Sequence, residues 1–194
     1  MTKTTLKQKE IFAEFVKLLS ETEANLCVPV IDYLLELGYT LHRTKEKKIE
    51  FRKFGYNILK IEQHSVLYGK ATPKLVVSFR FSACESYSKV FQEAISRKTV
   101  AMLKSGGEYK SLEKCCGFCK VPRRYKYYDE HGNAIYRCGI SVHDIRDLTI
   151  DDLPELLDLI KEQDEYFVMV KNSKLEPTEL YKGHFYKNKR LQKT

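Results

Sequence analysis

Hydrophobic residues recur with helical spacing in four stretches of the chain. Apolar positions separated by one, three and four residues predict amphipathic helices over about residues 6–20, 28–37, 85–104 and 151–170. Pro29 suits the first turn of the second helix, and Gly38 suits a left-handed stop after its end. Thr149 or Asp151 can cap the last helix, with Pro154 in its first turn.

Between the helical stretches the hydrophobic period changes to two, which is typical of strands. Residues 49–54 and 56–61 predict two strands joined by a tight turn at Gly55. A third strand over 73–82 alternates most clearly, with Leu75, Val77, Phe79 and Phe81 on one face. A hairpin is expected over 124–128 and 134–138, around a turn at 129–133, with a short further strand at 140–143.

This order of elements predicts an α+β fold. Strands that follow one another through short turns favour an antiparallel or mixed sheet, with helices mainly on one face, plus a cysteine-containing β-hairpin. We expect a single domain over residues 1–170, which includes the cysteine knuckle and hairpin at 114–143. A basic C-terminal extension is expected over 171–194, because this segment holds seven basic and two acidic residues, or +5 of the net charge of +8.

The N-terminal sequence has no apolar stretch followed by a small-residue cleavage site, and no apolar run is long enough to span a bilayer. We therefore expect a cytoplasmic protein that does not enter a membrane. In that compartment its six cysteines are thiols or metal ligands before they are disulfides.

The cysteine segment is the most specific local feature of the chain. Cys116 and Cys119 form a C-x-x-C with a glycine between them, a spacing that places two thiolates at two corners of one zinc tetrahedron. If Tyr128 pairs with Ala134, Arg124 lies opposite Cys138, which brings Cys138 back beside the knuckle. The sequence therefore predicts that these three cysteines converge in a structural zinc site.

The fourth ligand of this predicted site stays open. Cys115, His143 or the more distant Cys84 could complete it. Free, partly buried thiols are one alternative to a metal site, and a redox pair is another, because a C-x-x-C at a helix start lowers the pKa of one thiol. No helix is expected to begin at Cys116, which counts against the redox pair.

Cations alternate with aromatic residues just after the knuckle. Bases stack on aromatic rings and cations meet phosphates, so this pattern suits single-stranded nucleic acid. The candidate nucleic-acid-binding residues are Arg123, Arg124, Tyr125, Lys126 and Tyr127. The competing interpretation is a strand whose Tyr125 and Tyr127 point inward to the sheet, with the cations in solvent, and the alternation favours it.

Several stretches resemble an uncharacterised family of small bacterial proteins. The resemblance covers most of residues 27–167 and rests on the strand at 79–83, the helix at 87–95, the cysteine knuckle, Tyr136-Arg137-Cys138-Gly139 and the closing helix. It implies an α+β fold and a possible metal, and it implies no known activity.

Taken together, the sequence favours a binding or regulatory module with a structural zinc-type cysteine site. Nothing in it resembles a phosphate-binding loop, a nucleophile elbow or a catalytic zinc motif, so an enzyme is the less favoured class and no catalytic residue is assigned. The rival functions are a nucleic-acid-binding protein that uses the basic hairpin and tail, and a thiol-dependent redox enzyme. The possible partners are nucleic acid or a small ligand.

Overall fold

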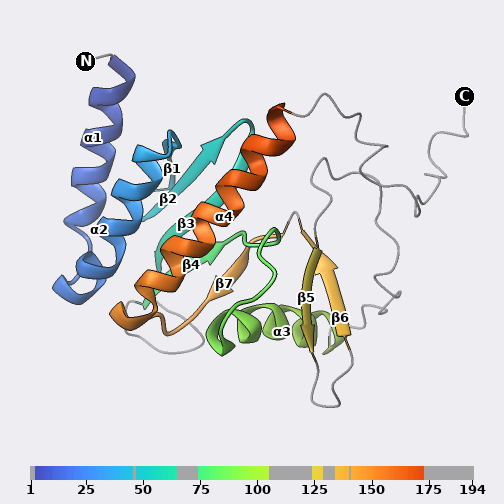
Figure 1. Cartoon of the computed structure of the whole chain (residues 1–194). Coiled ribbons are helices and arrows are strands. Elements are labelled where there is room, and N and C mark those ends of the chain that lie inside the picture. The colour runs from blue at the N-terminus through green and yellow to red at the C-terminus, as the bar shows by residue number, and fades with distance from the viewer. Residues whose placement is uncertain are drawn as a thin grey trace, which may run out of the picture.

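The computed structural model describes residues 3–45, 47–64, 74–104, 124–128, 134–139 and 141–172 (Figure 1). The helices in this part of the chain are α1 (Lys3–Val16), α2 (Glu21–Glu36), α3 (Lys89–Lys104) and α4 (Leu153–Asn172), and a 3-10 turn, η1 (Ile150–Asp152), leads into α4. The strands are β1 (Thr40–Lys45), β2 (Lys48–Lys53), β3 (Tyr56–His64), β4 (Lys74–Phe79), β5 (Arg124–Tyr128), β6 (Ala134–Cys138) and β7 (His143–Ile145).

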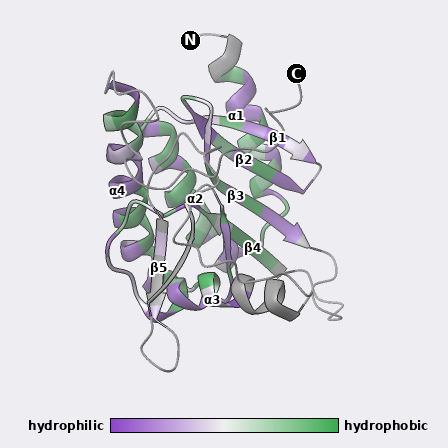
Figure 2. Cartoon of the chain, turned by 90° about the vertical axis from the view of Figure 1, so that its right-hand side faces the viewer, coloured by the Kyte–Doolittle hydropathy of each residue, from purple (hydrophilic) through white to green (hydrophobic). Residues whose placement is uncertain are grey.

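Five of these strands form one antiparallel sheet in the order β1-β2-β3-β4-β7, and β5 pairs with β6 in a separate two-stranded sheet. Helices α2 and α4 pack together on one side of the large sheet, as the quarter-turned view in Figure 2 shows. Helix α3 packs against β7 and β5, and α1 packs against the edge strand β1. The structure thus confirms the predicted α+β class and its antiparallel sheet.

Helix α2 begins seven residues before the predicted start, and this places Pro29 inside the helix instead of in its first turn. The start is fixed by a capping box: the Glu23 amide donates to Ser20 Oγ over 3.3 Å, and the Ser20 amide donates to Glu23 Oε2 over 2.9 Å. Pro29 cannot donate a helical hydrogen bond. The helix continues past it because five of its side chains are buried in the core: Leu26, Cys27, Val30, Ile31 and Leu34.

Strand β1 was missed by the hydrophobic pattern, and β7 lies slightly later than expected. Only Leu41 is buried among the six residues of β1, because this strand forms the edge of the sheet. A strand with a single buried residue among polar ones has no alternation of apolar and polar positions, so β1 could not be predicted from its hydrophobic pattern. β7 runs over His143–Ile145, not 140–143. Of its three residues, His143 and Ile145 are buried and Asp144 is exposed.

The turn between β2 and β3 forms at the predicted place. Phe54 and Gly55 have φ values of 54° and 81°, as a two-residue turn between twisted antiparallel strands requires. Gly38 also takes a positive φ, 83°, just after the end of α2, which confirms its predicted stop.

Of the four residues predicted to share one face around β4, Val77, Phe79 and Phe81 are buried and Leu75 is half-buried. Phe79 and Phe81 are fully buried, and among the described residues five rings pack around that of Phe81: Phe79, Tyr87, Phe91, Tyr125 and His143. The ring centroids of Tyr87, Phe91 and Tyr125 lie 5.0, 5.6 and 4.9 Å from that of Phe81, all near edge-on. Phe81 therefore joins the end of β4 to α3 and to the β5–β6 hairpin.

Tyr125 fixes the hairpin against the domain through its hydroxyl as well as its ring. The ring is 1% exposed and lies 4.4 Å from the His143 ring, centroid to centroid. The hydroxyl donates to the Ser141 carbonyl over 2.6 Å and accepts from the Phe81 amide over 3.3 Å. Burial raises the pKa of this hydroxyl above its usual range, so it remains a donor at all ordinary pH values.

We predict that Tyr125→Phe destabilises the protein by about 1–3 kcal/mol, because the buried Phe81 amide and the Ser141 carbonyl lose a partner while the ring still fills its space. Urea unfolding measures the change. The matched control is Tyr128→Phe, at a residue 58% exposed in the same strand, which we expect to change stability by less than about 0.5 kcal/mol. Equal effects of the two variants would show that the Tyr125 hydroxyl does not hold the hairpin.

Candidate functional site

The hairpin of the predicted cysteine site pairs in the expected register. Arg124 lies opposite Cys138, and Tyr128 lies opposite Ala134. Cys115, Cys116 and Cys119 lie outside the described residues, as do Arg123 and the tail beyond residue 172. The convergence of the cysteines therefore stays a prediction. It required a hairpin register that places Cys138 opposite Arg124, which the structure has, and a position for the knuckle, which lies outside the described residues.

The hairpin residues predicted to contact nucleic acid divide between two faces. Tyr125 is buried against Phe81 and His143, so it points inward as the alternation predicted and no base can stack on it. Tyr128 is 58% exposed and shares its strand face with Arg124 and Lys126. The candidate nucleic-acid surface thus loses Tyr125 and gains Tyr128, which the sequence analysis did not single out.

The two cysteines whose side chains are described are both buried thiols. Cys84 donates to the Leu159 carbonyl over 3.5 Å between sulfur and oxygen. Cys27 is 1% exposed, and burial, with the Glu23 carboxylate as the lesser cause, raises the pKa of its thiol to about 12. Neither has the exposed, electropositive setting of a reactive cysteine.

A buried ion pair joins the β2–β3 turn to α4. Lys53 Nζ donates to both carboxylate oxygens of Asp164, over 2.8 and 3.0 Å, and lies 5.3 Å from the ring centroids of Tyr39 and Phe54. Burial and the Asp164 carboxylate raise the pKa of the Tyr39 hydroxyl above its usual range. Each charge here has its partner, so the cluster holds structure together instead of offering a free acid or base.

A second polar cluster crosses the sheet on the face opposite α2 and α4. Register pairs align one residue from each strand in a single row: His42, Glu50, Lys60, Ser78 and Asp144. The Glu50 carboxylate is 3% exposed because Arg52 and Asn57 donate to it, the latter over 2.6 Å, and Lys60 Nζ lies 3.8 Å away. Glu50 is therefore surrounded by polar partners, and farther along the row Ser78 Oγ donates to Asp144 Oδ1 over 2.7 Å.

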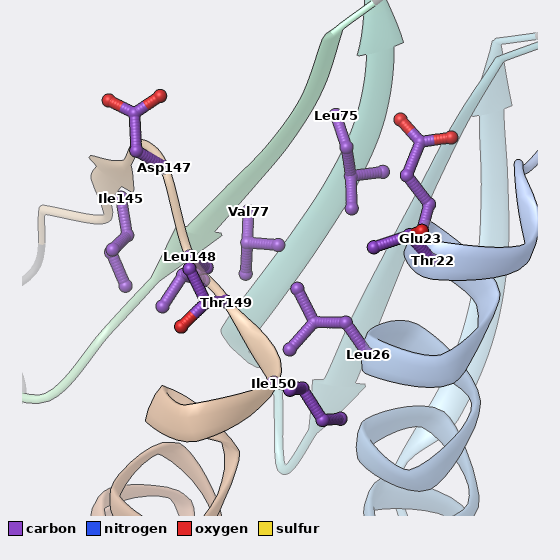
Figure 3. A pocket seen from close by; sticks show the side chains of 10 residues that line it. All are labelled: Thr22, Glu23, Leu26, Leu75, Val77, Ile145, Asp147, Leu148, Thr149 and Ile150. Atoms are coloured by element: carbon purple, nitrogen blue, oxygen red, sulfur yellow. The ribbon is translucent and has the colours of Figure 1, made fainter.

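One cavity of about 200 Å³ opens where α2 and η1 both begin, on the helix side of the sheet (Figure 3). Its walls are mainly aliphatic side chains from α2, β4, β7 and the loop before η1: Leu26, Leu75, Val77, Ile145, Leu148 and Ile150. In Figure 3 the side chains of Leu26, Val77 and Leu148 converge on the same space. Ile150 is 53% exposed, so apolar surface remains open to solvent here.

Four polar side chains complete the lining of this cavity: Thr22, Glu23, Asp147 and Thr149. Glu23 belongs to the α2 capping box. Thr149 is tied to the next turn, since its amide and hydroxyl both donate to Asp152 Oδ2, over 2.8 and 2.9 Å. Asp147 has a φ of 60°, a conformation that aspartate tolerates better than most residues.

The sequence analysis did not find this cavity. Its lining comes from residues 22–26, 75–77 and 145–150, which only the sheet order brings together. The signal that was present is the Ser20-Glu21-Thr22-Glu23 capping pattern, which marks a helix start at Glu21, seven residues before Val28.

Comparison with known proteins adds no relative: no family model, curated protein or solved structure matches the chain. Within the described ranges, no three His, Cys, Asp or Glu side chains are grouped so as to hold a metal ion. A search of the same residues for a helix long and apolar enough to cross a membrane found none.

We predict that Cys27 resists alkylation at pH 8 in the native protein. With a pKa of about 12 only about one thiol in ten thousand is ionised at that pH, and the thiolate is the reactive form. Iodoacetamide labelling followed by peptide mass spectrometry should give a rate at least about a hundredfold below that of the same thiol in urea-unfolded protein. The rate should climb only as pH approaches 12. Equal rates in native and unfolded protein would contradict the burial of Cys27.

Proposed function

We propose that this protein is a binding or regulatory module, not an enzyme, with its hairpin closed by a structural zinc ion. The observation that carries the zinc proposal is the β5–β6 register, in which Cys138 lies opposite Arg124. Only four residues, 120–123, separate Cys119 from Arg124, so five Cα-to-Cα steps join them. They span at most about 17 Å, and partner residues across strands lie about 5 Å apart, so Cys119 is within reach of Cys138.

Cys115 is the fourth ligand that the described contacts favour. His143 is fully buried, with its ring against Tyr125, and Cys84 is engaged with the Leu159 carbonyl. Both alternatives thus belong to the core of the domain. The site proposed for zinc is then Cys115, Cys116, Cys119 and Cys138, a thiolate set that suits structural zinc in a reducing, cytoplasmic compartment.

A non-catalytic role is supported by the state of the buried acids. Among the described residues the buried carboxylates are Glu50 and Asp164, and both accept hydrogen bonds from cationic side chains. Each of these carboxylates joins separate parts of the fold, Glu50 to Asn57 of β3 and Asp164 of α4 to Lys53 of β2, which is a structural role.

We predict that protein purified with zinc carries one zinc per chain and that Cys138→Ser loses it. Because structural zinc binding is coupled to folding, the same variant should unfold at a lower urea concentration. Elemental analysis gives the stoichiometry, and urea unfolding with and without a chelator gives the stability. The chelator should destabilise the parent protein and leave Cys138→Ser unchanged.

Cys27→Ala is the matched control for that experiment, because Cys27 lies in α2, away from the hairpin. We expect it to lose stability, since it empties buried space, while it keeps a full complement of zinc. A parent protein that binds no zinc, or a Cys138→Ser protein that keeps it, would refute the structural zinc site.

Nucleic-acid binding is the second candidate function, and one observation favours it. Tyr128 is 58% exposed, and it ends a strand in which Arg124 and Lys126 occupy the alternate positions before it. Stacking on such a ring contributes about 1–3 kcal/mol per base. The thiol-dependent redox function rests on Cys116 and Cys119, which lie outside the described residues, and it stays a prediction.

If the hairpin binds nucleic acid, Tyr128→Ala should weaken binding of a labelled single strand by about five- to a hundredfold. Deleting residues 173–194 should weaken it further and flatten its salt dependence, since fewer phosphate contacts release fewer counterions. Fluorescence anisotropy at two salt concentrations measures both effects. An exposed aromatic elsewhere serves as the control: Phe54→Ala, at 46% exposure, should leave binding unchanged. Failure of the full chain to bind at low salt would eliminate this candidate.

A further inference from the structure

A groove of about 450 Å³ lies between helix α1 and the edge strand β1. Three residues of α1 and four consecutive residues of β1 line it: Lys7, Gln8, Ile11, Thr40, Leu41, His42 and Arg43. Its volume falls in the range of ligand sites, about 300–1,000 Å³. Strand β1 is paired on one side only, because it ends the order of the sheet. The groove therefore lies at the open edge of the sheet.

The hydrogen-bond pattern shows which backbone groups of β1 face away from the sheet. The Gln63 amide donates to the carbonyl of Lys47, just before β2, over 3.0 Å, so the backbone of Lys47 is turned toward β3. Successive residues of a strand turn their N–H and C=O to opposite sides. Glu50, three positions further on, is therefore turned toward β1, where it lies opposite His42. Leu41, next to His42, then points its N–H and C=O away from β2 and out of the sheet.

The backbone groups of Leu41 are nearly buried and lack a partner. This residue is 4% exposed, and among the described residues no hydrogen bond reaches its N–H or C=O on the open side. A buried backbone group without a hydrogen bond is costly, and nearly all such groups in native proteins are paired. An extended peptide beside β1 supplies both missing partners at once, because one of its residues offers an acceptor and a donor at the spacing of a strand.

We propose that the groove between α1 and β1 binds an extended peptide of a partner protein as an added strand, with an apolar side chain toward Ile11 and an acidic one near Lys7. A peptide residue opposite Leu41 has its side chain on the same face of the sheet as Leu41, which is the face of the core. This inference names a partner for the proposed binding module, rests on that part of the proposed function and is independent of zinc.

The charge of the groove favours an acidic peptide. None of the seven described residues that line it is acidic. Arg43 is already paired with Glu14, so the charge that selects the peptide is that of Lys7, which has no ion pair among the described residues. An aspartate or glutamate of the peptide gives Lys7 a partner at a partly exposed site, which contributes up to about 1 kcal/mol.

A second copy of this chain is the other strand that could pair with β1, and its composition disfavours it. Apart from Leu41 every residue of β1 is polar, and Arg43 and Lys45 are basic. Antiparallel pairing of two such strands brings like charges across from each other, which is destabilising. Basic side chains on an edge strand are a common protection against this kind of self-pairing. A peptide of opposite charge has no such obstacle.

Three capped pentapeptides test the proposal on the ¹⁵N-labelled full-length protein. The first has valine at its centre, threonine on either side and aspartate at both ends. The second is the same peptide with its central valine N-methylated, which removes a donor and adds bulk at the strand edge. The third has lysine in place of both aspartates. We expect millimolar binding of the first, at least about fivefold weaker binding of the second, and at least about threefold weaker binding of the third.

Amide hydrogen exchange shows on which side of β1 the peptide lies. With the first peptide at saturation the Leu41 amide should exchange at least about threefold more slowly, because it gains an acceptor. The His42 amide is the internal control, since it already faces β2, and its rate should not change. Without peptide, a tenfold rise in protein concentration should leave the Leu41 rate unchanged. Slowing under that condition would assign the edge to a second copy and overturn the peptide.

Substitutions in α1 test the charge and the apolar wall separately. Lys7→Gln should weaken the first peptide about two- to fivefold, and Lys9→Gln, the same change at an exposed residue outside the groove, should not. Ile11→Ala should weaken the first and third peptides alike, by about threefold or more. Its control is Leu6→Ala, at a residue 53% exposed outside the groove, which should weaken neither.

The proposal is overturned if none of the peptides binds, if the N-methylated peptide binds as tightly as its parent, or if the lysine peptide binds more tightly than the aspartate peptide. It is also overturned if Lys9→Gln weakens binding as much as Lys7→Gln does. Zinc content is measured on the same samples. Loss of peptide binding with zinc retained would refute only the peptide groove, and absence of zinc with peptide binding intact would refute only the metal site.

Discussion

The burial of Tyr125 against Phe81 is the contact on which the arrangement of the second half of the chain depends. Phe81 lies just after β4, and the aromatic rings around it come from before and within α3, from β5 and from β7. Edge-to-face packing of buried rings is directional, so it fixes orientation as well as proximity. The Tyr125 hydroxyl, held between the Phe81 amide and the Ser141 carbonyl, then sets the position of the hairpin along its own axis.

The parts of the fold that the sequence predicts are those where one local signal suffices. The hairpin register follows from a polar turn between tyrosine-rich strands, and β4 follows from four alternating apolar residues. The start of α2 and the whole of β1 were missed for a different reason. Pro29 is a strong helix-start signal that tertiary packing overrides, and β1 is defined only by its partner β2, since it buries Leu41 alone.

The candidate sites divide in the same way. A C-x-x-C is a contiguous pattern, so the sequence can propose a metal site there without any knowledge of the fold. The cavity has no contiguous pattern, because Leu26, Val77 and Ile145 become neighbours only through the pairing of β4 with β7 and the packing of α2 over them.

Strand β7 links the two sites, although it has only three residues. His143 packs against Tyr125 of the hairpin, and Ile145 forms part of the cavity floor. Both positions are held by the same short ladder, in which Phe79 pairs with His143 and Val77 pairs with Ile145. A shift of β7 by one residue would turn both side chains to the other face of the sheet. The shape of the cavity and the attachment of the hairpin therefore both depend on the register between β4 and β7. The aromatic cluster around Phe81 fixes this register at His143, and the aliphatic side chains beside α2 fix it at Ile145.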